Sequence, residues 1–278
     1  MKRFGCLLIV VAVLCAALPA SAEGAATASG LIAFAEDQVG NAYIYGAYGQ
    51  ISTDWFRRAR AELYPDAAKL IFRWGAAWDG LPAYDCIGLF KAYAISAGMR
   101  DLDVKDINTT RAWYEWTSEK GLLEGSTLQP GMALFRVEGT RTLVRHMGIY
   151  IGDGRVIHAR GTRWGVAEDM LPGVFTHWAT LNWMEYDLPM EQTPAVQGVF
   201  LPEGSRAVVE SDDAERVIVS EIPHEAGKLR LVKGYFDDGT PLTVLAVPDE
   251  ISRQVRGTDI HGNELIGYVR LTELREAE

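Results

Sequence analysis

The sequence predicts an α+β domain followed by a small all-β domain. Segments with helical periodicity come first, and strand-like runs joined by short turns follow them. All eight tryptophans lie between Trp55 and Trp183, and none lies after that. Residues 189–278 carry 17 acidic and 9 basic residues, against 20 and 16 in residues 23–187. We therefore expect a first domain at residues 23–188, a Pro- and Gly-containing linker at 189–200, and a second domain at 201–278.

Composition excludes several classes of protein. The chain has 278 residues, of which 48% are hydrophobic and 23% charged, so a core can form and wholesale disorder is excluded. The formal net charge is −10. This excess of acidic residues argues against a nucleic-acid partner, because proteins that bind nucleic acids normally have a basic patch that meets the phosphates.

The first 22 residues have the pattern of a secretory signal. Lys2 and Arg3 precede a mostly apolar run, residues 4–18, and Pro19-Ala-Ser-Ala22 supplies a small-residue cleavage site. We expect cleavage after Ala22 and a secreted or envelope-associated protein with no membrane span. The alternatives are an uncleaved anchor, for which the run falls short of the ~20 apolar residues a span needs, and a lipoprotein, which Leu14 disfavours.

The first domain reads as helices followed by strands. Helices are expected at 31–39 with Ser29 as the N-cap, from a cap within residues 52–54 through residue 63, and at 65–78, 86–97 and 112–120. Strands are expected at 133–137, 144–151 and 155–160. In the second domain, short strands are expected at 207–210, 217–222, 229–232, 242–247 and 265–271, which favours a small barrel.

Cys86 is the first candidate for chemistry. Cys6 and Cys15 leave with the signal, so the exported chain keeps Cys86 alone, at the predicted start of a helix. The partial positive charge of a helix N-terminus favours a nucleophilic thiolate. The alternative is a small buried hydrophobic residue, the usual state of a free cysteine.

Two histidines lie on one predicted hairpin. His146 and His158 flank a Gly152-Asp-Gly154 turn. A two-residue loop would pair Ile149 with His158 and put the histidines on opposite faces. A three-residue loop pairs Gly148 with His158, which brings both histidines to one face, and we expect this loop. The chemistry is then Cys86 as nucleophile, His146 as base and His158 orienting it. No third ligand supports a metal, and no cofactor is implied.

These residues resemble the NlpC-like cell-wall cysteine peptidases. Asp85-Cys86-x-Gly88-Leu89 is similar to that family's cysteine signature, and residues 146–159 are similar to its histidine hairpin. Residues 128–131 and 35–49 are similar to its strand-entry turn and its opening segment. The resemblance covers residues 31–188 and implies a papain-like fold with helices packed on an antiparallel sheet.

The resemblance also implies roles for individual residues. Cys86, His146 and His158 form the triad, and the backbone N–H of Cys86 donates to the oxyanion. Tyr43 lies beside the thiol, or is a core tyrosine, and Tyr45 follows it in the same segment. Asp85 contacts substrate, or is only the helix N-cap.

The chain departs from the family pattern in two places. Ile87 stands where a serine is usual, which affects the specificity expected for the stem peptide. Residues 50–84 form an aromatic-rich insertion, in which Trp74 is a candidate for a wall over the substrate cleft.

The expected activity is hydrolysis of peptidoglycan stem peptides at a γ-D-glutamyl–diamino acid bond or a neighbouring amide. One alternative is a related thiol amidase or acyltransferase, and another is a non-catalytic wall-binding protein. Residues 201–278 resemble a bacterial SH3-like barrel in size, strand spacing and the closing segment 267–271.

Overall fold

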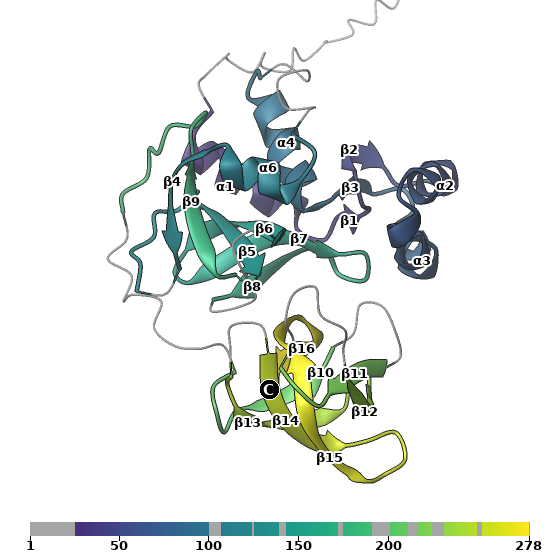
Figure 1. The fold of residues 1–278 in the computed structure, drawn as a ribbon. Coiled ribbons are helices and arrows are strands. Elements are labelled where there is room, and N and C mark those ends of the chain that lie inside the picture. The colour runs from purple at the N-terminus through teal and green to yellow at the C-terminus, as the bar shows by residue number, and fades with distance from the viewer. Residues whose placement is uncertain are drawn as a thin grey trace, which may run out of the picture.

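The computed structural model describes residues 26–99, 107–123, 125–138, 143–171, 175–190, 201–210, 216–223, 231–248 and 252–277. The predicted signal peptide, most of the predicted linker and part of the expected strand 229–232 lie outside these residues. The described chain forms a helix-and-sheet domain and a separate C-terminal β-domain, residues 201–277 (Figure 1). The predicted α+β class is confirmed.

An antiparallel six-stranded sheet is the centre of the first domain. Its order is β4-β9-β5-β6-β7-β8. The strands are β4 (Thr117–Leu122), β5 (Ala133–Glu138), β6 (Leu143–Gly152), β7 (Arg155–Gly161), β8 (Gly165–Met170) and β9 (His177–Leu181). The expectation of a helix through residue 120 is wrong after Glu115, because the polar segment that follows pairs with β9 instead. Strand pairing here outweighs a local preference.

Three helices cover one face of the sheet (Figure 1). They are α1 (Ala28–Gln38), α4 (Cys86–Ser96) and α6 (Thr110–Glu115). Nearly all side chains of α4 are buried, because it lies between the sheet and other elements rather than at the surface. The N-cap of α1 is Thr27, not Ser29 as expected: the Thr27 hydroxyl accepts the Gly30 N–H at 3.1 Å, while the Ser29 hydroxyl bonds Asp187.

A small lobe holds the segment that precedes α4. It contains β1 (Ala42–Tyr43), β2 (Tyr48–Ile51), β3 (Pro82–Tyr84), α2 (Asp54–Leu63), α3 (Pro65–Trp74) and a 3₁₀ turn, η1 (Gly75–Trp78). The expected helix 65–78 is thus divided at Gly75. Strand β3 pairs with β1 and β2 and leads directly into α4. The lobe therefore determines where α4 begins.

The histidine hairpin has the predicted register with a different turn. Ile149 pairs with Ile157, so Gly148 lies opposite His158 and both histidines share a face. The turn contains two residues, Asp153 and Gly154, both at positive φ. A bulge between Tyr150 and Gly152 supplies the residue that a three-residue loop would have supplied.

The C-terminal β-domain is a seven-stranded sheet with its own core. Its strands are β10 (Arg206–Val209), β11 (Arg216–Ser220), β12 (Val232–Asp237), β13 (Pro241–Ala246), β14 (Ser252–Thr258), β15 (Glu264–Arg270) and β16 (Leu274–Glu276), with a 3₁₀ turn, η2 (Leu271–Glu273). Strands β14 and β16 were not predicted, because charged residues interrupt their apolar alternation. The likeness to an SH3-like barrel stays a prediction.

Candidate active site

Cys86 is the first residue of α4, and Asp85 caps that helix. One carboxylate oxygen of Asp85 accepts the Gly88 N–H at 2.6 Å, and the other accepts the Gly46 N–H at 2.7 Å. Both oxygens of Asp85 are thus used by the backbone, and the residue is 4% exposed. Of the two roles expected for Asp85, the geometry gives it the N-cap, and a contact with substrate stays a prediction.

The thiol of Cys86 lies against the strand that carries His146. The backbone N–H groups of Met147 and Ile87 lie close enough to the Cys86 thiol to lower its pKa, against the larger effect of burial. Met147 follows His146 in β6, and α4 packs on that strand, so the start of the helix lies close to the part of β6 that carries the histidine. The first turn of α4 therefore packs against the middle of β6, and the catalytic roles of Cys86 and His146 stay predictions.

The two histidines are hydrogen-bonded to each other. Nε2 of His146 lies 2.6 Å from Nδ1 of His158, and both residues are buried. The ring of Phe175 stacks on His146, with 5.6 Å between the ring centroids and 23° between the planes. Phe175 also meets the His158 ring edge-on. The aromatic ring thereby packs against both members of the pair.

Burial determines the charge of this site. It raises the pKa of the Cys86 thiol to about 12, with the Asp85 carboxylate adding to the effect. Burial lowers the pKa of His146 well below its ordinary value, and the charge of His158 lowers it further. At neutral pH the resting site therefore holds a neutral thiol and a neutral imidazole. The expected thiolate does not form at rest, because desolvation outweighs the helix N-terminus.

Asp169 completes the polar chain, and the sequence reasoning missed it. Its Oδ2 lies 2.8 Å from Nε2 of His158. Burial would raise the pKa of Asp169, but the hydrogen bond with His158 holds it below the ordinary value. His158 pairs with Ala167 in β8, so Asp169 lies two residues further on the same face. A strand assigned to 165–170 would have shown this position.

A cleft runs along this end of the sheet, and residues of both domains line it. The lining includes His146, His158 and Asp169 from the sheet, Tyr43 and Tyr45 from the small lobe, and Glu210 from the C-terminal β-domain. Tyr45 also lines a second cleft, together with Asp85 and Ile87.

The structure brings some of the predicted substrate residues to the cleft and leaves others beside it. Tyr45 lies near Asp85, since burial raises the pKa of Tyr45 and the charge of Asp85 adds to that effect. Trp74 lies beside Arg163, and the guanidinium carbon is 5.2 Å from the centroid of the Trp74 ring. Trp74 is not among the residues that line the first cleft. From the insertion, Ala67 and Leu70 line the cleft, while Trp55 is 77% exposed.

Among the described residues, no group of three or more His, Cys, Asp or Glu side chains could hold a metal ion. No helix in the same part of the chain is long and apolar enough to cross a membrane.

Comparison with known proteins finds a family to which this part of the chain is similar. Residues 69–182 match the model of the NlpC/P60 family. The matched segment is less than half of the chain. Cys86, His146, His158 and Asp169 all lie inside the NlpC/P60 match, whereas Tyr43, Tyr45 and the C-terminal β-domain lie outside it.

Solved structures of NlpC/P60 domains resemble the chain. The NlpC/p60 domain of peptidoglycan hydrolase SagA is 17% identical, with 56% of this chain and 99% of that chain covered and a TM-score of 0.37. The P60 domain of antigen MAP1204 from M. avium subspecies paratuberculosis is 16% identical, with 56% and 94% covered and a TM-score of 0.37. Ly7917 is 11% identical, with 90% and 96% covered and a TM-score of 0.28. No curated protein matches the chain.

Proposed function

We propose that this protein is an exported cysteine peptidase that hydrolyses peptidoglycan stem peptides, at a γ-D-glutamyl–diamino acid bond. The observation that carries the proposal is the hydrogen-bonded pair of His146 and His158 on the strands β6 and β7, against which the helix that begins at Cys86 packs, inside a segment that matches the NlpC/P60 family. Export rests on the signal-like pattern of residues 1–22, and the bond rests on the family resemblance.

The reaction begins from a neutral pair. His158 occupies Nε2 of His146, which leaves Nδ1 as the nitrogen that takes the thiol proton. The sulfur then attacks the substrate carbonyl carbon, and the oxyanion forms at the start of α4, where the Cys86 N–H donates to it. His146 gives its proton to the leaving amine, and an acyl-enzyme remains. Water, deprotonated by His146, hydrolyses the thioester and restores the thiol.

Because a substrate must enter before the proton moves, the resting thiol is expected to react slowly with alkylating agents. Slow labelling at neutral pH is therefore no sign of an inactive site, and turnover is the deciding measurement. Defined muropeptides are incubated with the wild-type protein and with Cys86→Ala, His146→Ala and His261→Ala, and the products are identified by mass spectrometry. His261 lies in an exposed turn of the C-terminal β-domain, so His261→Ala is the matched histidine control.

We expect free-acid products from the wild type and from His261→Ala, and none above background from Cys86→Ala or His146→Ala. Thermal melting shows that the inactive variants are folded. Equal digestion by Cys86→Ala would refute the proposal. Transfer to an added amine without free acid would instead indicate an acyltransferase, and no product from any folded form would indicate a wall-binding protein.

A further inference from the structure

The two histidines can hold their shared proton in either of two patterns, and only one pattern gives a base. In the productive pattern, His146 carries its proton on Nε2 and has a lone pair on Nδ1 for the thiol proton. In the reverse pattern, Nδ1 of His158 donates to Nε2 of His146, and the proton of His146 then lies on Nδ1. The distance of 2.6 Å between Nε2 of His146 and Nδ1 of His158 fits both patterns equally well.

Asp169 selects between the two patterns. An ionised carboxylate has no proton to donate, so at 2.8 Å it must accept the proton on Nε2 of His158. Nδ1 of His158 is then an acceptor, Nε2 of His146 must be the donor, and Nδ1 of His146 is left unprotonated. The direction of both hydrogen bonds thus follows from the charge of Asp169. The side chain of Asp169 is 37% exposed at the edge of the cleft.

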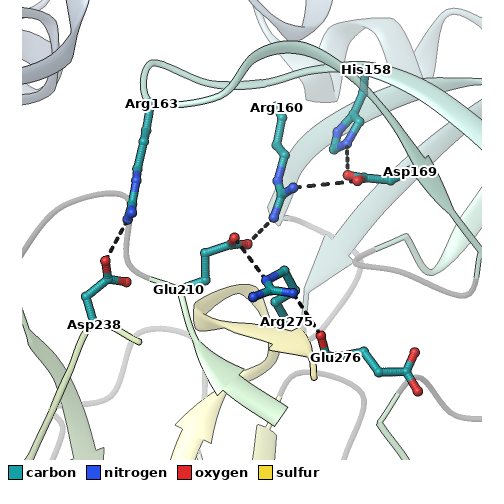
Figure 2. Close-up of polar contacts among 8 residues, drawn as sticks. All are labelled: His158, Arg160, Arg163, Asp169, Glu210, Asp238, Arg275 and Glu276. Carbon is teal, nitrogen blue, oxygen red and sulfur yellow. Dashed lines mark hydrogen bonds and ion pairs between the residues drawn. The ribbon is translucent and has the colours of Figure 1, made fainter. Parts of the chain in front are cut away.

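Asp169 is in turn positioned from the other domain. Its second oxygen, Oδ1, lies 3.5 Å from Nη1 of Arg160. The other terminal nitrogen of Arg160 is ion-paired with Glu210, at the end of β10 in the C-terminal β-domain. Glu210 also lies 3.5 Å from Arg275 in that domain. Figure 2 shows the resulting continuous path from Arg275 through Glu210, Arg160 and Asp169 to His158.

We propose that Asp169 is a positioning residue that sets which nitrogens of His146 and His158 carry protons, and that Glu210 of the C-terminal β-domain holds Arg160 in the place from which it orients Asp169. The kinetic part of this inference rests on the proposed peptidase function. The protonation pattern is a property of the resting protein and does not depend on it.

The decisive variant is Asp169→Asn. Arg160 is ion-paired with Oδ1 of Asp169, so its positive charge should orient the new amide with its carbonyl toward Arg160 and its NH₂ toward His158. The NH₂ donates to Nε2 of His158, so Nδ1 of His158 carries the proton and donates to Nε2 of His146. The proton of His146 then lies on Nδ1. Asp169→Ala removes the side chain without imposing either pattern. We therefore expect the nearly isosteric variant to be the worse enzyme, the opposite of what a merely structural role predicts.

Two measurements follow. In ¹⁵N-histidine NMR spectra of the resting protein, the wild type should show both rings protonated on Nε2, and Asp169→Asn should show both protonated on Nδ1. In muropeptide hydrolysis, kcat should fall about 100-fold or more in Asp169→Asn and about tenfold in Asp169→Ala, with KM within about twofold in both. Wild-type ring protonation in Asp169→Asn, or equal kcat values for the two variants, would overturn the role of Asp169.

The contribution of the C-terminal β-domain has a matched control. Asp238 forms a second ion pair between the domains, with Arg163 at 3.0 Å, and this pair does not touch Asp169 (Figure 2). Glu210→Gln and Asp238→Asn each remove one carboxylate charge from the interface. We expect kcat to fall several-fold in Glu210→Gln alone, at unchanged KM and melting temperature of the first domain. Equal kcat values for these two variants would refute the part assigned to Glu210.

If the wild type hydrolyses no muropeptide, the NMR comparison still tests Asp169. Wild-type rings protonated on Nε2 and a reversal in Asp169→Asn would then support the proton pattern while the peptidase proposal fails. Rings protonated on Nδ1 in the wild type would refute the pattern whatever the activity.

Discussion

Gly88 is the position where the smallest change should do most damage to the site. A Cβ on Gly88 would lie 1.8 Å from the carbonyl oxygen of Ala47, and ordinary contact begins at 3.4 Å. The Ala47 carbonyl also accepts the Asp85 N–H at 2.8 Å, so the first turn of α4 and the small lobe are held together at this contact. The variant Gly88→Ala must therefore push α4 away from the lobe and break that hydrogen bond.

The size of the effect follows from three contributions. Overpacking a tight contact destabilises by about 1–3 kcal/mol. A buried hydrogen bond left unmade adds about 1–3 kcal/mol. Alanine favours a helix more than glycine does, which offsets about 1 kcal/mol of this destabilisation. We expect Gly88→Ala to lower the free energy of unfolding of the first domain by about 3 kcal/mol, with loss of activity because the thiol moves relative to His146.

The assay uses the distribution of tryptophan. All eight tryptophans lie in the first domain, so intrinsic fluorescence in a urea titration follows the unfolding of that domain. Ser96→Ala is the control, because Ser96 is an exposed residue of the same helix whose hydroxyl donates to the Tyr93 carbonyl one turn earlier. It should stay within about 0.5 kcal/mol of the wild type and be fully active. A wild-type urea midpoint and wild-type activity in Gly88→Ala would refute the reasoning.

Three further predictions concern charge and packing around the site. Burial raises the pKa of Asp85 to about 6 from 3.8, so the folded state holds the proton more tightly, and stability should fall by about 2 kcal/mol as pH rises from 4 to 7; urea titrations of Asp85→Asn across that range should lack this decline. Gly148→Ala puts a Cβ 2.7 Å from Phe175 and 3.0 Å from Cβ of His158, so kcat should fall at least tenfold while circular dichroism stays unchanged. Trp113 is fully buried against Phe90, Trp116 and Trp183, so Trp113→Ala should destabilise the first domain by about 3–5 kcal/mol, measured by differential scanning calorimetry.

The parts of the site that the sequence predicted are those determined by neighbouring residues. Asp85 before Cys86 is a capping pattern, and the two histidines are related by a hairpin whose register follows from its alternation. The three-residue loop predicted for this hairpin was wrong, because a two-residue turn with a bulge gives the same register. Local pattern therefore predicted which side chains meet but not how the backbone turns between them.

The parts that the sequence did not predict depend on distant packing. Asp169 reaches His158 only through the pairing of β7 with β8, and Glu210 reaches Arg160 only through contact between the domains. The protonation of Cys86 also depends on distant packing. Its place at a helix N-terminus is visible in the sequence, but the burial that keeps the thiol neutral comes from residues on several elements.

The acidic surplus of the second domain has a meaning that composition alone did not reveal. Residues 189–278 carry the greater part of the net negative charge, and an acidic surface favours cationic groups on a partner. In the structure, Glu210 and Asp238 are instead paired with Arg160 and Arg163, which lie at the edge of the site-bearing sheet. The side chain of Glu210 is 12% exposed, so salt screens it less than an open surface pair. Part of the charge thus holds the two domains together, at the cleft where Asp169 orients the histidines.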